Sequence, residues 1–209
     1  MAGGLMSLTN ENTFETAIVS SLIEEGDYEQ GNAADYNPET GIFENEILSF
    51  LKESQVREWK QISTIHGEKA EKLLIQRLLK ELDSRGSLDV LRNGFVDYGV
   101  RFQLAFFKPV SGLNPDALAL YEKNRLKVYR QVFYSRNNKN SVDILLSING
   151  IPVATMELKN QFTGQDVGNA LKQYSTTRDN REILFAFKKR SLVHFAVDQD
   201  EVFMTTKLD

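Results

Sequence analysis

The chain contains no cysteine and only two histidines, His66 and His194, among its 209 residues. Without cysteine it can form no disulfide bond, no zinc finger and no thiol nucleophile. The two histidines stand far apart in the sequence, which argues against a histidine-rich metal site. Any metal that binds here must therefore be held mainly by carboxylate oxygen, which favours a hard ion such as Mg²⁺.

Long hydrophobic runs are also missing. No apolar stretch reaches the roughly 18 residues that a membrane-spanning helix needs, and residues 1–11 lack the basic start and apolar core of a secretory signal. We therefore expect a cytoplasmic protein that does not contact a membrane. Its composition, 41% hydrophobic and 26% charged, is that of a globular chain long enough to bury a sizeable core.

The net charge of −4 is unevenly distributed along the chain. The first 100 residues hold 9 Lys and Arg against 18 Asp and Glu, whereas residues 101–209 hold 16 against 11. Within 172–190, six basic residues stand against two acidic ones. This asymmetry predicts either a basic face that meets phosphate or, more simply, a solvated basic surface.

The first half of the sequence has the spacing of apolar residues that is typical of helices. We expect a helix that begins at Asn12 or Thr13 and ends at Gly26, where glycine is suited to stop it. Four further helices are expected, the first of which opens at Asn37-Pro38; they cover about 38–51, 55–65, 68–84 and 87–91.

From residue 100 onward the pattern becomes that of strands. Strands are expected at 100–107, 126–134, 141–148, 153–158, 183–187, 192–197 and 202–205, with helices after Asn114-Pro115 and from Gly164 to about 178. Asn149-Gly150 predicts a tight hairpin turn. The order of elements predicts an α/β (α+β) fold with one central mixed sheet, flanked by helices and carrying a helical elaboration at about 35–95.

Three charged residues gather at one end of the predicted hairpin. Glu157 and Lys159 are two apart on a strand and project to the same side, and strand pairing can bring Asp143 beside them. Adjacent carboxylates repel, and a divalent cation removes that repulsion. The pattern predicts a Mg²⁺ site at Asp143 and Glu157, in which Lys159 orients a water and offsets charge on a phosphate. The alternative is an ion pair of Lys159 with either carboxylate.

The surrounding sequence resembles a known family. An Asp on one strand followed by Glu-x-Lys on the next is similar to the PD-(D/E)xK nuclease core. More specifically, residues from about 100 to the end resemble the N-terminal endonuclease domain of the restriction (R) subunit of type I restriction-modification enzymes. The motifs that carry this resemblance are Asn114-Pro115, 121–125, 130–135, Asp143, 149–153, 157–160, Thr163-Gly164, 172–174, 193–198 and 204–208.

The resemblance assigns the principal site residues. Asp143 and Glu157 match the family's metal-binding acids, and Lys159 matches its catalytic lysine. Glu15 matches the position of a further acid that many such nucleases place near the metal. Its alternative interpretation is an exposed carboxylate favoured by the dipole of the first helix.

Accessory residues follow on the next helix. The family often has a Gln-x-x-x-Tyr motif there; Tyr174 fits it, but Ala170 stands where the glutamine belongs and Gln173 precedes the tyrosine. Which of Gln173 and Tyr174 serves the site stays open. Lys172 and Arg178 are candidate contacts for DNA phosphate; a surface Arg178 paired with Asp179 or Glu182 is the alternative.

The resemblance implies one nuclease domain over 1–209, with its catalytic core at about 100–205. It would be a Mg²⁺-dependent endodeoxyribonuclease that hydrolyses double-stranded DNA, and a fragment of a larger subunit that lacks the ATP-dependent motor domains. No nucleotide-binding P-loop sequence is present, so ATP would be used only by the full subunit. Methyltransferase (M) and specificity (S) subunits would be its partners. The alternative is a catalytically degenerate module of nuclease fold, used for DNA gripping or subunit assembly.

Overall fold

A computed structural model describes residues 11–110, 114–159, 167–174 and 178–208. A six-stranded mixed sheet forms the centre, in the order β1-β4-β5-β6-β7-β8. Its strands are β1 (Glu29–Gln30), β4 (Leu126–Phe133), β5 (Ser141–Ile148), β6 (Ile151–Leu158), β7 (Val193–Val197) and β8 (Val202–Thr205). The pairs β1·β4 and β6·β7 are parallel and the others antiparallel. The predicted α+β fold with a mixed central sheet is confirmed.

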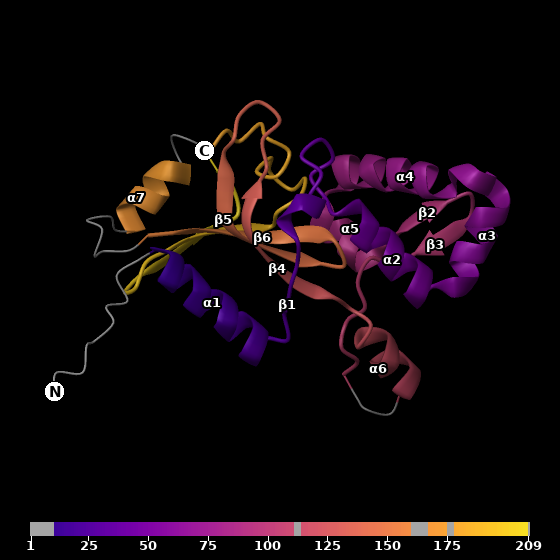
Figure 1. Cartoon of the computed structure of the whole chain (residues 1–209). Coiled ribbons are helices and arrows are strands. Elements are labelled where there is room, and N and C mark those ends of the chain that lie inside the picture. Colours follow the sequence, from indigo (N-terminus) through magenta and orange to yellow (C-terminus); the bar gives the residue numbers. More distant parts are fainter. Residues whose placement is uncertain (1–10, 111–113, 160–166, 175–177, 209) are drawn as a thin grey trace.

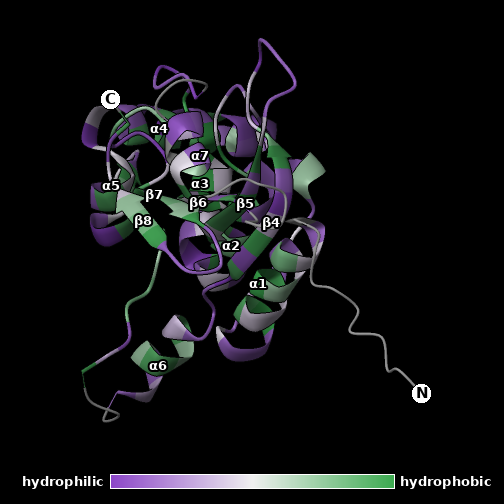
Figure 2. Cartoon of the chain, turned by 90° about the vertical axis from the view of Figure 1, so that its left-hand side faces the viewer, coloured by the Kyte–Doolittle hydropathy of each residue, from purple (hydrophilic) through white to green (hydrophobic). Residues whose placement is uncertain are grey.

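Helices cover both faces of this sheet (Figure 1). On one face α1 (Glu11–Glu25) packs through Val19 against apolar residues of β4, β5 and β6. On the other face, α7 (Val167–Lys172) contributes Val167 and Ala170 to a second core, which it shares with β4, β5 and β7. Figure 2 shows that the hydrophobic residues gather in the central strands, whereas the outer loops are hydrophilic.

A helical layer lies at one side of the sheet (Figure 1). It comprises α2 (Glu44–Ser54), α3 (Val56–His66), α4 (Ala70–Arg85), α5 (Ser87–Asn93) and a small hairpin of β2 (Phe95–Asp97) and β3 (Val100–Phe102). Its own apolar core includes Ile151 of β6, which links it to the main sheet. This layer is the predicted helical elaboration. Short 3-10 turns at Ala33–Asp35 and Gly67–Lys69 and the helix α6 (Pro115–Tyr121) complete the described elements.

Several predicted boundaries are wrong. The segment 183–187 forms successive turns rather than a strand, because the amides of Phe185 and Ala186 both donate to the carbonyl of Glu182. The second helix begins at Glu44 instead of Pro38, since Asn37 first pairs with Ile42 in a tight bridge. The expected strand at 100–107 shortens to β3. Of the helix expected from Gly164 to 178, residues 164–166 and 175–177 lie outside the described residues.

The β5–β6 turn is the joint between the sheet and the helical layer. Asn149 (φ 50°) and Gly150 (φ 86°) both have left-handed backbone, as a two-residue type I′ hairpin requires, so the predicted tight turn is confirmed. The Gly150 carbonyl accepts a hydrogen bond from the Phe43 amide at 3.0 Å. A Cβ added at Gly150 would lie 2.7 Å from the Phe43 carbonyl oxygen and 2.7 Å from the side chain of Ile47.

We predict that Gly150→Ala destabilises the chain by about 2–4 kcal/mol, because backbone strain adds to overlap with the start of α2. Gly99→Ala is the matched control: Gly99 (φ 82°) occupies the same position of the β2–β3 turn but has open space around it. Its expected cost is about 1 kcal/mol of strain alone. Urea denaturation measures both, and equal losses would contradict the close contact at Gly150.

Candidate active site

Asp143 and Glu157 are neighbours across the β5–β6 hairpin. Ile144 pairs with Met156, so the preceding residue of β5 and the following residue of β6 lie side by side. The Leu158 amide donates to Asp143 Oδ2 at 2.8 Å, which fixes the Asp143 carboxylate against the end of β6. The hairpin therefore brings the two predicted acids together.

Glu157 is fully buried (0% exposed). Its Oε1 accepts from Arg178 Nε at 2.9 Å and lies 2.7 Å from Arg178 Nη2, whereas its Oε2 is buried without a hydrogen-bond partner. Burial and the charge of Asp143 raise the pKa of Glu157 to about 8, although Arg178 acts to lower it. A buried carboxylate beside a second carboxylate is a strained electrostatic arrangement, which an additional cation would relieve.

Lys159 completes the predicted trio. It follows β6, is half-buried, and its amide donates to the carbonyl of Val197 in β7 at 2.9 Å. Its charge acts to lower the pKa of Glu157. Lys159 is two residues beyond Glu157 along the chain, so all three predicted residues belong to the same end of the hairpin.

Glu15 reaches the same place from α1. It is 2% exposed, so the interpretation as an exposed first-turn carboxylate is wrong. Its Oε1 accepts from Arg130 Nε at 2.5 Å, and its Oε2 accepts from Gln131 Nε2 at 3.0 Å. The same Gln131 Nε2 donates to Asp143 Oδ1 at 3.1 Å. Only one side chain separates the two acids.

Sequence reasoning did not single out Gln131 or Arg130 as site residues. Both stand inside the 130–135 motif that carries part of the family resemblance, which is the one signal that points to them. Sequence spacing does not point to either residue as part of the site, because Arg130 is 115 positions from Glu15 and Gln131 is 116 positions from it. Only the packing of α1 against β4 brings them together.

Tyr174 is buried beside the site. Its hydroxyl lies 3.0 Å from Thr155 Oγ1, which in turn lies 2.8 Å from His194 Nδ1. Burial and the charge of Glu157 raise the pKa of Tyr174 well above its ordinary value. Gln173 is half-buried, and its carbonyl accepts from the Arg178 amide at 3.0 Å. Lys172 is exposed at the end of α7.

Arg178 is 9% exposed and faces inward. Besides Glu157, its guanidinium donates to the Tyr134 hydroxyl at 2.9 Å and to the Ser141 carbonyl at 2.7 Å. The interpretation as a surface arginine paired with Asp179 or Glu182 is wrong, since Asp179 pairs with Arg181 and Glu182 accepts from Ser135. All three guanidinium nitrogens of Arg178 therefore donate hydrogen bonds to other groups of the protein.

The donor set suits a hard divalent ion bound largely through water. The described residues contain no group of three or more His, Cys, Asp or Glu arranged to hold a metal. Mg²⁺, however, is commonly held by one or two carboxylates with several of its waters kept. Asp143 with Glu157, whose buried Oε2 has no hydrogen-bond partner, meets that requirement.

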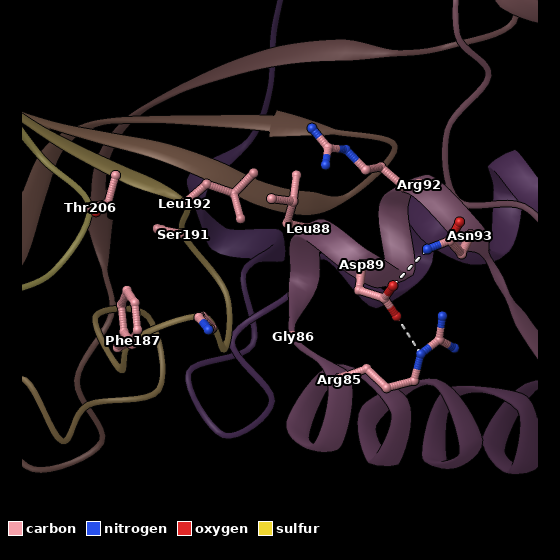
Figure 3. Close-up of a pocket in the computed structure, with 11 residues that line it drawn as sticks. Arg85, Gly86, Leu88, Asp89, Arg92, Asn93, Phe187, Ser191, Leu192 and Thr206 are labelled. Atoms are coloured by element: carbon pink, nitrogen blue, oxygen red, sulfur yellow. Dashed lines mark hydrogen bonds and ion pairs between the residues drawn. The ribbon is translucent and has the colours of Figure 1, made fainter.

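A separate cavity of about 410 Å³ lies between α5 and the segment that leads into β7 (Figure 3). Leu88, Leu192 and Phe187 form apolar parts of its wall, and Arg92 and Lys188 add positive charge. Asp143, Glu157 and Glu15 do not line this cavity, so it is separate from the candidate active site.

Comparison with known families gives one match. A family model described as type I restriction enzyme R protein N terminus matches residues 9–209. The chain belongs to this family. No curated protein matches the sequence. The predicted membership in this family is therefore confirmed, over residues 9–209. Within the described residues, no helix has the length and apolar character needed to cross a membrane.

The pKa of Glu157 in this R-subunit domain has a consequence for stability. Its folded value of about 8 lies above the ordinary 4.5, so the folded chain holds this proton more tightly than the unfolded chain. Without metal, the free energy of unfolding should fall as pH rises from about 4.5 to about 8. Glu157→Gln removes the titrating group and should flatten that decline. Urea unfolding in EDTA across this range measures it, with exposed Glu201→Gln as control; parallel declines in wild type and Glu157→Gln would contradict the assignment.

Proposed function

We propose that this chain is the Mg²⁺-dependent endonuclease domain of a type I restriction enzyme R subunit, and that it hydrolyses phosphodiester bonds of double-stranded DNA. One observation carries the proposal: Asp143 and Glu157 are neighbours at the end of the β5–β6 hairpin, and Glu157 Oε2 is buried there with no hydrogen-bond partner among the described residues. Family membership supports the proposal independently.

Asp143 and Glu157 would hold the ion. The Leu158 amide and Gln131 each donate to one oxygen of Asp143, which fixes the plane of that carboxylate. Arg178 occupies Oε1 of Glu157 and leaves Oε2 for the metal. Since the N–H and C=O of a strand residue point to the same side, the Leu158 carbonyl is suited to be a further oxygen ligand.

Lys159 would act on the water and the phosphate. When bound, Mg²⁺ would stabilise negative charge on the phosphate as a Lewis acid. The Lys159 ammonium would orient the attacking water and donate to a phosphate oxygen on which charge develops. The new P–O bond would form to the water oxygen, which loses a proton to solvent. The bond to the leaving oxygen of the DNA strand would break in line on the opposite side of phosphorus, and that oxygen would take up a proton from solvent.

An exposed cation at the end of α7 would help to position the DNA backbone. Of the six basic residues in 172–190, Arg178 and Arg190 are buried (9% and 1% exposed) and serve internal contacts. The remaining four, Lys172, Arg181, Lys188 and Lys189, are exposed or half-buried. Among them Lys172 stands nearest in sequence to Tyr174 and is our candidate phosphate contact. Base recognition would belong to the S subunit, with M and S as partners and ATP used by the motor part of the R subunit.

A second function is a catalytically degenerate module for DNA gripping or subunit assembly. Ala170 favours it, since this fully buried alanine stands where the family often has the glutamine of Gln-x-x-x-Tyr. The two functions differ in metal binding, because a scaffold has no reason to bind Mn²⁺ or Mg²⁺ at Asp143 and Glu157.

Metal binding tests the site directly. Titration calorimetry of the chain with Mn²⁺ should show one bound ion, and Asp143→Ala should abolish its binding. Lys159→Ala should bind the ion at least as tightly as wild type, because a neighbouring positive charge is removed. Absence of binding by the wild-type chain would favour the degenerate module.

Cleavage by the full R–M–S complex tests the chemistry. Asp143→Ala and Lys159→Ala should each abolish cleavage of double-stranded DNA while ATP hydrolysis continues at the wild-type rate. Lys60→Ala, an exposed lysine of α3 in the helical layer, should leave both activities unchanged. Undiminished cleavage by either site variant refutes the proposed site.

A further inference from the structure

Gln131 has an unusual backbone for a residue in a strand. Its φ of +51° is left-handed, a conformation that side chains other than Gly, Asn and Asp rarely adopt. The β4–β5 pairing steps from Arg130↔Ile144 to Val132↔Val142, which leaves Gln131 opposite Asp143 without a regular ladder partner. Strain of this kind costs on the order of 1 kcal/mol or more and persists where the surrounding contacts require it.

The carboxamide of Gln131 is held on three sides. Nε2 donates to Glu15 Oε2 at 3.0 Å and to Asp143 Oδ1 at 3.1 Å, and Oε1 accepts from Ser141 Oγ at 3.0 Å. Only the NH₂ end of an amide can donate to two carboxylates, so the orientation follows from the partners. The left-handed backbone thus places the uncharged Gln131 amide, which donates two hydrogen bonds, between Glu15 and Asp143.

We propose that Gln131 is a positioning residue, which separates Glu15 from Asp143 and holds the Asp143 carboxylate in the orientation that binds the metal; this rests on the proposed function. The Leu158 amide restrains Oδ2 of Asp143, and Gln131 restrains Oδ1. Without Gln131, the restraint on Oδ1 that holds this orientation of the carboxylate is lost. Hydrogen-bond partners of metal ligands typically change metal affinity 10- to 100-fold.

Because Gln131 is exposed, an experiment can distinguish the positioning role from a role in packing. Its side chain is exposed, so truncation opens no cavity in the core. Glycine at this position relieves the left-handed strain. Gln131→Gly should therefore fold with a stability no lower than wild type and yet bind Mn²⁺ about 10-fold or more weakly. A residue that served only the fold would show the opposite pattern, a lower unfolding midpoint and unchanged affinity.

Gln131→Met tests donation without adding charge. A methionine keeps about the length of the side chain and the same backbone strain, but its thioether cannot donate to Glu15 or Asp143. We expect weaker Mn²⁺ binding here as well. Lys188→Gly is the matched control, because Lys188 (φ +68°) is an exposed left-handed residue on a distant loop. It should relieve strain and leave the affinity unchanged.

The experiment is Mn²⁺ titration calorimetry of the four chains at pH 7.5, with urea unfolding midpoints measured in EDTA. Weaker binding in Gln131→Gly and Gln131→Met, with wild-type affinity in Lys188→Gly, supports the inference. Wild-type affinity in Gln131→Met overturns it and leaves the proposed function standing. If Gln131→Gly does not fold, the role is structural unless Gln131→Met folds and binds weakly. If the wild-type chain binds no Mn²⁺, the proposed function fails and the positioning role with it.

Discussion

The buried Glu157 carboxylate sets the constraint around which this end of the molecule is organised. A carboxylate that is 0% exposed and next to Asp143 is costly unless a cation compensates it. Arg178 provides that compensation from beyond α7. The same guanidinium donates to Tyr134 after β4 and to the Ser141 carbonyl at the start of β5. The Arg178 guanidinium thereby links the segment after α7 to β5, to β6 and to the residue that follows β4.

Arg178 compensates the buried Glu157 carboxylate only in part, and the oxygen that it leaves uncompensated bears on the chemistry of the site. Arg178 satisfies only Oε1, and the charge of Asp143 still raises the pKa of Glu157. An ion pair that served only stability would satisfy both oxygens, since an unpaired buried acceptor costs about 1–3 kcal/mol. Groups of the described residues therefore leave Oε2 of Glu157 uncompensated, and this is the place that the proposed metal ion would occupy.

Local sequence signals predicted the elements that depend on local chemistry. The Asn149-Gly150 turn, the bounds of β5 and the mixed sheet were all accessible from the sequence, because turn dipeptides and apolar alternation act over a few residues. The strand expected at 183–187 was wrong for the same reason. Leu184 and Phe185 are consecutive and both buried, so their apolar run reflects burial in the second core rather than a strand.

The residues that sequence analysis misread are those whose role depends on distant partners. Arg178 and Arg190 read as part of a basic run, yet both are buried, and Arg190 donates to the Thr40 carbonyl and pairs with Asp83. Charge counted along the sequence cannot tell a cation that faces DNA from one that holds a core together. Apart from its place in the 130–135 motif, Gln131 gave no signal, because its amide donates to residues distant in sequence or on the paired strand, Glu15 of α1 and Asp143 of β5.

The two faces of the sheet meet at this one strand end. From one side α1 brings Glu15, which reaches Asp143 through Gln131. From the other side the segment after α7 brings Tyr174 and Arg178 to Glu157. Because β5 and β6 are central strands with neighbours on both sides, their ends have little freedom to move. Side chains from α1 and from the segment after α7 therefore arrive at a rigid frame, and the geometry of Asp143 and Glu157 is set by packing.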